Sequence, residues 1–199
     1  MATAEFLFDF GSPNAYLAHR VIPQIEARTG VRFTYTPVLL GGLFKLTGNQ
    51  APMLAFAGIP NKLAYEMLEL RRFVARHKLE AFQMNPFFPV NTLLLMRGAV
   101  AAEMDGVLAQ YVEAGFQHMW EQPKKMDDPV VWAEAMTASG LDAERLLARS
   151  KDEDVKAKLM ANTDAAAKRG AFGIPSFFVG EELYFGKNTL PDVEAALTA

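Results

Sequence analysis

The first part of the chain changes from a two-residue hydrophobic period to a helical one and back. Residues 5–10 carry three alternating phenylalanines, a pattern typical of a buried strand. Residues 13–28 place apolar side chains at a spacing of four, which predicts an amphipathic helix ending at Gly30. Residues 31–35 alternate again, and this second strand is expected to break near Pro37. The order strand, helix, strand predicts a parallel pair joined by a right-handed crossover.

The centre of the chain has helical periodicity up to about Gly170. Prolines, glycines and capping residues divide it into separate helices. Ser150 and Glu153 match a capping box, so a helix is expected to begin there. The other helices are predicted after Pro60, over residues 92–104 and 106–121, and from Asp127 to Gly140.

The pattern returns to strands near the carboxyl end. Two short apolar runs, 176–179 and 183–185, flank a Gly-Glu-Glu turn that predicts a hairpin, and a last short helix follows from Thr189. We therefore expect an α/β fold in which residues 1–42 and 169–199 together build one sheet. Residues 43–168 are expected to form an inserted helical domain.

Composition limits the classes of partner. The chain has 199 residues, of which 51% are hydrophobic, so it can bury a sizeable core. A formal net charge of −3 favours neither nucleic acid nor an anionic membrane as a partner. No apolar run approaches the ~18 residues of a membrane helix. The amino-terminal segment lacks the features of a signal peptide, so a cytoplasmic location is expected.

The chain contains no cysteine. A disulfide framework and a redox dithiol carried by the protein are therefore excluded, and any thiol chemistry requires a thiol brought by a ligand. The three histidines, His19, His77 and His118, show no spacing of metal ligands, so no metal site is expected.

Ser12 stands where the first strand ends and the first helix begins. Ser12 is the expected N-cap, and Pro13 is the first helical residue. Free backbone N–H groups and the helix dipole favour an anion at such a place, and a serine hydroxyl donates a further hydrogen bond. A bound thiolate would fit this environment, which lowers a thiol pKa. The alternative is that Ser12 serves only as a helix cap.

Ile174 and Pro175 precede the third predicted strand. A cis proline there would leave the backbone of Ile174 available to an extended, peptide-like ligand, as in strand addition. The alternative is an ordinary trans proline at the first residue of a strand.

Several short motifs follow one another in a defined order along the chain. They are Ser12-Pro13 with Tyr16-Leu17, Gly48-Asn49 with Pro52, Pro60 with Lys62 and Tyr65, Phe88 to Asn91, and Phe172 to Pro175. This ordered set resembles the 2-hydroxychromene-2-carboxylate isomerase family, which is related to kappa-class glutathione transferases within the DsbA-like thioredoxin group. The resemblance implies a thioredoxin-like fold with an inserted helical domain, a glutathione cofactor and a homodimer.

The resemblance also implies roles for individual residues. Ser12 would face the glutathione sulfur, and the backbone of Ile174, beside a cis Pro175, would pair with the cysteinyl part. Asn49 and Lys62 would line the same site; a loop asparagine and a solvated lysine are the alternatives. The remaining positions expected to bind the cofactor are Phe185, Gly186, Lys187 and Asn188.

The last of these segments departs from the family pattern. Members often carry an aspartate that meets the γ-glutamyl ammonium, whereas this chain has the uncharged Asn188 with the cation Lys187 beside it. Glu69 replaces a frequent aspartate, and its spacing predicts an ion pair with Arg72.

Three further residues are candidates for substrate contact. Lys45 would meet a substrate carboxylate, or would simply face solvent. Phe88 and Asn91 would line the pocket of an aromatic substrate, or would form a packed loop with a capping asparagine.

The activity implied by the resemblance is the glutathione-dependent cis-trans isomerisation of 2-hydroxychromene-2-carboxylate, or a related aromatic pyruvate-type acid, in aromatic catabolism. The thiolate would add reversibly to the conjugated double bond, and Ser12 would hold that thiolate without being the nucleophile. Lys45 or Lys62 would bind the carboxylate. Two alternatives remain: a kappa-like transferase that conjugates electrophiles, and a non-catalytic thioredoxin-like binding module.

Overall fold

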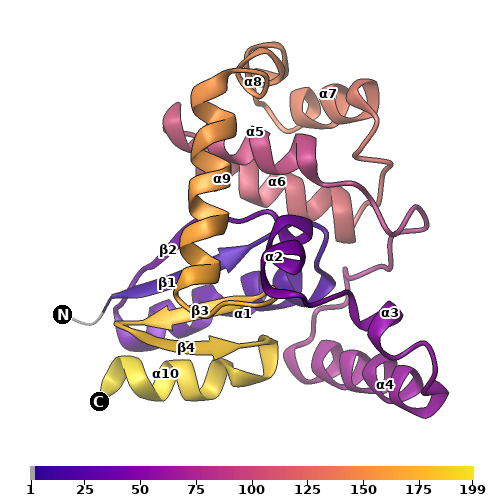
Figure 1. Cartoon of the computed structure of the whole chain (residues 1–199), viewed down its shortest axis with the longest axis vertical. Helices are drawn as coiled ribbons and strands as arrows, with labels where there is room; N and C mark the ends of the chain where they lie inside the picture. The colour runs from indigo at the N-terminus through magenta and orange to yellow at the C-terminus, as the bar shows by residue number, and fades with distance from the viewer. Residues whose placement is uncertain (1–2) are drawn as a thin grey trace.

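The two ends of the chain build one mixed sheet (Figure 1), as the hydrophobic pattern predicts. The computed structural model describes residues 3–199. The strand order is β2-β1-β3-β4, with β1 and β2 parallel and the other pairs antiparallel. The strands are β1 (Ala4–Phe8), β2 (Phe33–Pro37), β3 (Ser176–Val179) and β4 (Glu182–Phe185).

Helix α1 (Pro13–Thr29) forms the crossover between the two parallel strands. Ser12 caps its first turn in an extended conformation, and Pro13 occupies the first helical position, where a missing N–H costs nothing. Gly30 ends the helix with a φ of 73°, a left-handed conformation that favours glycine. Both predicted ends of this helix are confirmed.

Helices fill the chain between β2 and β3. In Figure 1, α5 to α8 stack above the sheet, α9 runs down to it, and α3 and α4 lie to one side. A short 3₁₀ helix (Lys187–Thr189) and α10 (Leu190–Thr198) follow the hairpin. The helices are α2 (Leu40–Thr47), α3 (Pro52–Ala55), α4 (Pro60–His77), α5 (Leu93–Met104), α6 (Leu108–Trp120), α7 (Pro129–Ala138), α8 (Ala143–Arg149) and α9 (Glu153–Lys168). None of the helices described in residues 3–199 has both the length and the apolar character needed to cross a membrane.

The predicted capping box at Ser150 is wrong. Ser150 follows α8 as its C-cap, and its hydroxyl donates to the carbonyl of Leu147 at 2.8 Å. Helix α9 begins two residues later than expected, after Asp152. The serine therefore ends one helix instead of starting the next, which the local motif alone cannot distinguish.

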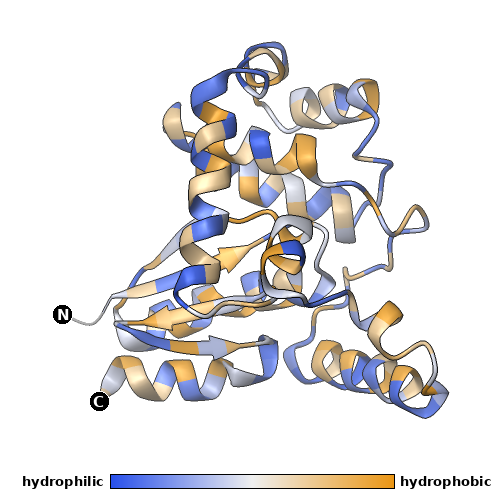
Figure 2. Ribbon diagram, in the orientation of Figure 1, coloured by the Kyte–Doolittle hydropathy of each residue, from blue (hydrophilic) through white to orange (hydrophobic). Residues whose placement is uncertain are grey.

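Aromatic rings join the sheet to the helices above it. Phe8 and Phe10 are fully buried, and the Phe10 ring lies 4.9 Å from that of Phe116 on α6. The indole of Trp120 donates to the Phe10 carbonyl at 2.8 Å. Figure 2 shows mostly hydrophobic residues along the central strands β1 and β3, whereas the edge strand β4 is more hydrophilic. The residues just before Ser12 are thus held in the core.

A buried histidine connects α1 to β2 and α6. The Nδ1 atom of His19 lies 2.9 Å from the hydroxyl of Tyr35, and Nε2 lies 3.2 Å from the carboxylate of Glu113. Burial lowers the pKa of His19, so the ring is neutral near pH 7, accepts from Tyr35 and donates to Glu113. The hydrogen bond from His19, together with Arg20, lowers the pKa of Glu113 to about 2, so the Glu113 carboxylate stays charged.

We expect this histidine to make folding stability fall in mild acid. The folded pKa of His19 lies below its unfolded value, so below about pH 6.5 the unfolded chain takes up a proton that the folded chain resists. The free energy of unfolding, measured with urea, should decrease from pH 7.5 to 5.5, by at most about 1.4 kcal/mol per pH unit for one group. The variant His19→Gln should show a shallower decrease; an unchanged slope would contradict the assignment.

Candidate active site

A buried carboxylate shapes the turn between β1 and Ser12. Asp9 is fully buried, and its two oxygens accept from the backbone N–H of Gly11 and of Leu40, each at 2.8 Å. Burial raises the pKa of Asp9, and these two hydrogen bonds oppose that rise. Asp9 therefore fixes the turn to the start of α2. Sequence reasoning missed this role, although an aspartate inside a buried apolar run was a signal for it.

Ser12 is buried and joined to the far end of the chain. Its hydroxyl oxygen accepts from the backbone N–H of Ala15 at 3.2 Å, and the hydroxyl donates to the carbonyl of Ile174 at 3.0 Å. The backbone N–H groups of Ser12 and Tyr16 are also engaged within the turn. In residues 3–199, the first unused donor of α1 is therefore the N–H of Asn14, which follows a proline without one.

The Ile174–Pro175 peptide bond is cis. Ile174 is mostly buried, and within the described chain its N–H donates to no other group. The carbonyl of Pro175 accepts from Gly186 at 2.9 Å, which attaches this turn to the end of β4. A backbone donor is thus left available beside Ser12.

The structure brings three other predicted positions to this turn. The side chain of Asn49 donates to the carbonyl of Phe172 at 2.8 Å, and the rings of Phe172 and Phe185 lie 4.5 Å apart. A Cβ atom on Gly173 would lie 2.7 Å from the Phe185 ring, so a larger residue there would have to displace that ring. Asn49, Phe185 and Gly186 therefore surround the loop that carries Ile174.

Lys62 and Lys187 are placed differently. Lys62 lies on the exposed face of α4 with its ammonium 3.5 Å from the centre of the Phe56 ring. Lys187 is buried, and its ammonium forms an ion pair with Glu69 of α4. The predicted pairing of Glu69 with Arg72 is wrong, because the tertiary fold supplies Lys187 instead. The cation expected beside Asn188 is therefore neutralised inside the protein.

Asn188 is exposed. It lines a small cavity of about 100 Å³ between α1, α4 and α10, together with Phe73, Arg76 and Lys187. Its side chain makes no hydrogen bond to another described residue, so it remains available for a ligand.

The three substrate candidates do not form a single group. Lys45 is exposed on α2. Phe88, which precedes a second cis proline, packs with its ring 6.1 Å from that of Trp120. Asn91 precedes Thr92, the N-cap of α5; its side chain accepts from the N–H of Leu93 at 3.0 Å, and it also lines a groove. Of the three candidates, only Asn91 lines this groove, and its side chain also bonds the first turn of α5.

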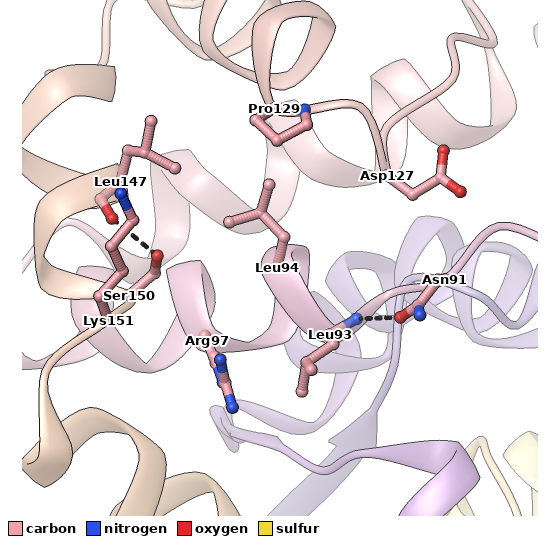
Figure 3. Close-up of a pocket in the computed structure, with 9 residues that line it drawn as sticks. All are labelled: Asn91, Leu93, Leu94, Arg97, Asp127, Pro129, Leu147, Ser150 and Lys151. Atoms are coloured by element: carbon pink, nitrogen blue, oxygen red, sulfur yellow. Dashed lines mark hydrogen bonds between the residues drawn. The ribbon is translucent and has the colours of Figure 1, made fainter.

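That groove lies over the first turns of α5 (Figure 3) and has a volume of about 440 Å³. Its lining is contributed by α5, the start of α7 and the turn between α8 and α9: Asn91, Leu93, Leu94, Arg97, Asp127, Pro129, Leu147, Ser150 and Lys151. Thr92 lies between the groove residues Asn91 and Leu93 and packs on the turn before Ser12, because a Cβ on Gly11 would lie 3.1 Å from the Thr92 methyl group. Sequence reasoning missed Arg97 and Lys151, which have no local motif.

The chemistry available at Ser12 is hydrogen-bond donation. Its partners in the described chain are Ala15 and Ile174, so no histidine or lysine stands ready to remove its proton. No group of His, Asp or Glu side chains in residues 3–199 is arranged to hold a metal ion. The unused N–H groups of Asn14 and Ile174, which adjoin this serine, are donors of the kind that bind an anionic or peptide-like ligand.

Comparison with known sequences decides the family. A sequence model of the DSBA-like thioredoxin domain matches residues 3–198. The chain belongs to the DSBA-like thioredoxin family. This assignment confirms the predicted thioredoxin-like α/β fold, in which Ser12 stands at the start of the first helix.

Two kinds of enzyme are similar to this DSBA-like chain. A 2-hydroxychromene-2-carboxylate isomerase of Sphingobium xenophagum is 26% identical and covers 98% of this chain and 97% of its own. A glutathione S-transferase kappa 1 of Rattus norvegicus is also 26% identical, and the match covers 86% of this chain and 78% of the transferase. A solved 2-hydroxychromene-2-carboxylate isomerase superposes with a TM-score of 0.83 at 23% identity over 98% of this chain and 94% of its own, which shows the shared fold.

Proposed function

We propose that this protein is a glutathione-dependent isomerase of 2-hydroxychromene-2-carboxylate or a related aromatic pyruvate-type acid. The observation that carries the proposal is the buried Ser12 hydroxyl at the start of α1, facing Ile174 in a chain that has no cysteine. The similarity to isomerases over nearly the whole chain supports the reaction class.

The residues present fit glutathione. An unused N–H on the mostly buried Ile174 matches the peptide groups of an extended tripeptide. The Asn14 N–H and the Ser12 hydroxyl lie at the positive end of α1, where a thiolate is stabilised. Asn49 and Lys62 are proposed to contact the cofactor, as are Pro175 and the segment from Phe185 to Asn188.

The protein's part in the reaction is to hold charge and restrict geometry. Bound glutathione would supply a thiolate, a nucleophile able to add reversibly to a conjugated double bond and so permit rotation about it. The Ser12 hydroxyl, which donates to the Ile174 carbonyl in this structure, would donate to the sulfur instead and so keep the thiolate ionised near neutral pH. Addition and departure consume no proton and no electron, so no general base at Ser12 is required.

A kappa-like glutathione transferase is the second candidate, because the rat kappa enzyme has the same 26% identity to this chain as the isomerase, although over less of its length. The fate of the product separates the two. Recovery of a geometric isomer with glutathione unconsumed supports the isomerase, whereas a stable thioether supports the transferase. Calorimetric titration with glutathione alone tests both enzyme hypotheses against the third, a non-catalytic binding module. The two enzymes are expected to bind glutathione, and the binding module is not.

We also propose a cytoplasmic homodimer with residues 1–42 and 169–199 as the thioredoxin-like part and 43–168 as the inserted helical part. Light scattering of the purified chain tests the dimer: a mass near twice 22.0 kDa is expected, and a mass near 22.0 kDa would contradict it.

Replacing Asn188 with aspartate should strengthen glutathione binding. The exposed Asn188 carries no charge, whereas a carboxylate there would attract the γ-glutamyl ammonium, since Lys187 is already neutralised by Glu69. An exposed ion pair contributes about 0.2–1 kcal/mol, so the Kd from calorimetry should fall up to about fivefold. A glutathione analogue without the amino group provides the control and should show no gain; an equal gain would show that the carboxylate acts in another way.

A further inference from the structure

The groove over α5 combines an apolar wall with unpaired positive charge. Leu93, Leu94, Pro129 and Leu147 supply apolar lining (Figure 3). A volume of about 440 Å³ is within the range of small-molecule sites. This lining suits the flat body of an aromatic compound.

Arg97 is the exceptional charge in this groove. Three arginines of the described chain are half-buried, and two of them, Arg20 and Arg149, pair with carboxylates. In residues 3–199, Arg97 has neither an ion-pair partner nor a side-chain hydrogen bond. A half-buried guanidinium with no partner is a binding site for a carboxylate, whose two oxygens match its planar donors.

The other charged residues of the groove do not cancel the positive charge of Arg97. Lys151, at the turn between α8 and α9, is exposed and has no carboxylate partner in the described chain. Asp127 is the acidic residue of the lining, and its carboxylate is paired with Lys125 at 3.0 Å. The groove therefore presents a net positive charge to an entering ligand.

The position of the groove relates it to Ser12. Asn91 lines the groove, and its neighbour Thr92 packs against Gly11, the residue before Ser12. Thr92 thus stands between the groove and the turn that carries Ser12, and neither Gly11 nor Ser12 lines the groove itself. Lys45 and Lys62, which we expected to bind the carboxylate, are not among the lining residues.

We infer that the groove over α5 binds an aromatic carboxylic acid, with Arg97 holding its carboxylate and the leucines packing on its ring. That this acid is the substrate rests on the proposed function, whereas the binding itself does not require glutathione.

The test is calorimetric titration of the full chain with trans-cinnamate, an aromatic acid of low reactivity, in the absence of glutathione. Wild-type protein should bind cinnamate, and Arg97→Met should raise the Kd about 10- to 100-fold, the range for loss of a charged hydrogen bond. Arg97→Lys keeps the charge but not the planar pair of donors, so its Kd for cinnamate should lie between those of wild-type protein and Arg97→Met. Wild-type protein should bind trans-cinnamamide as weakly as Arg97→Met binds cinnamate, a comparison that does not depend on the folding of any variant.

Arg32→Met is the matched control. It removes the same charge from an 86% exposed side chain at the opposite end of the parallel strands, and it should leave cinnamate affinity unchanged. Equal affinities of wild-type protein for cinnamate and cinnamamide, or an unchanged Kd in Arg97→Met, would overturn the inference. A separate titration with glutathione distinguishes the two proposals. If cinnamate binding depends on Arg97 but glutathione does not bind, only the proposed function is contradicted.

Discussion

Replacing Ser12 with alanine is expected to lower kcat for the glutathione-dependent reaction about 100-fold, the effect of removing one donor to a developing or bound anion. Alanine has no hydroxyl, so the bound sulfur loses the hydrogen bond that Ser12 now gives to Ile174. The pKa of the bound thiol should return toward its solution value near 8.5, where few molecules are ionised at pH 7. Steady-state kinetics at saturating glutathione and ultraviolet titration of the bound thiolate measure the two effects.

Two variants control for this substitution. Ser12→Thr keeps a hydroxyl and should retain much of the activity and most of the thiol pKa shift. Asp142→Ala removes another N-cap, at the start of α8, and should cost about 1 kcal/mol of stability without changing kcat. If Ser12→Ala kept the wild-type thiol pKa while losing only stability, Ser12 would be a helix cap and nothing more.

The second large effect is expected from Gly115→Ala in α6. A Cβ at this position would lie 2.4 Å from a ring carbon of Phe10, which is fully buried. The ring has no free space to move into because it packs against Tyr111 and Phe116. Such overpacking typically destabilises by about 1–3 kcal/mol, which urea unfolding would measure.

The same substitution should also affect the site. Phe10 precedes Gly11 and Ser12, so a shift of its ring is expected to displace the turn and lower activity in the protein that remains folded. Gly41→Ala in α2 is the matched control, since no atom lies within 4 Å of its Cβ position. Alanine should there stabilise by about 0.5–1 kcal/mol. Equal unfolding midpoints for both variants would show that the Gly115 contact relaxes without cost.

Local patterns were sufficient for the outer parts of the fold. The strand, helix and strand around Ser12 and the carboxyl-terminal hairpin follow from alternation, a cap and turn glycines, which act within a few residues. Helix α8 was missed because its seven residues are too few for a periodic signal. The mistaken capping box at Ser150 has the same cause, since the serine between two short helices satisfies either interpretation.

The candidate site also has one part that local motifs predict and one part that they do not. Ser12, Asn49 and Ile174 come from motifs, and the structure brings them to one turn. The pairing of Glu69 with Lys187 joins positions 118 residues apart, and the Arg97 groove needs three helices to exist. Contacts of this kind depend on the packed fold, so no single stretch of sequence contains them.

If Ser12 binds a thiol as proposed, its hydrogen bond to the Ile174 carbonyl would determine which form of the thiol binds. A neutral sulfur is a poorer acceptor than a peptide carbonyl, so a protonated thiol cannot draw the hydroxyl away from Ile174. A thiolate accepts strongly enough to do so. Under the proposed function, the Ser12–Ile174 hydrogen bond would therefore compete with the ligand for the hydroxyl, and the site would select thiols by their ionisation state as well as by their shape.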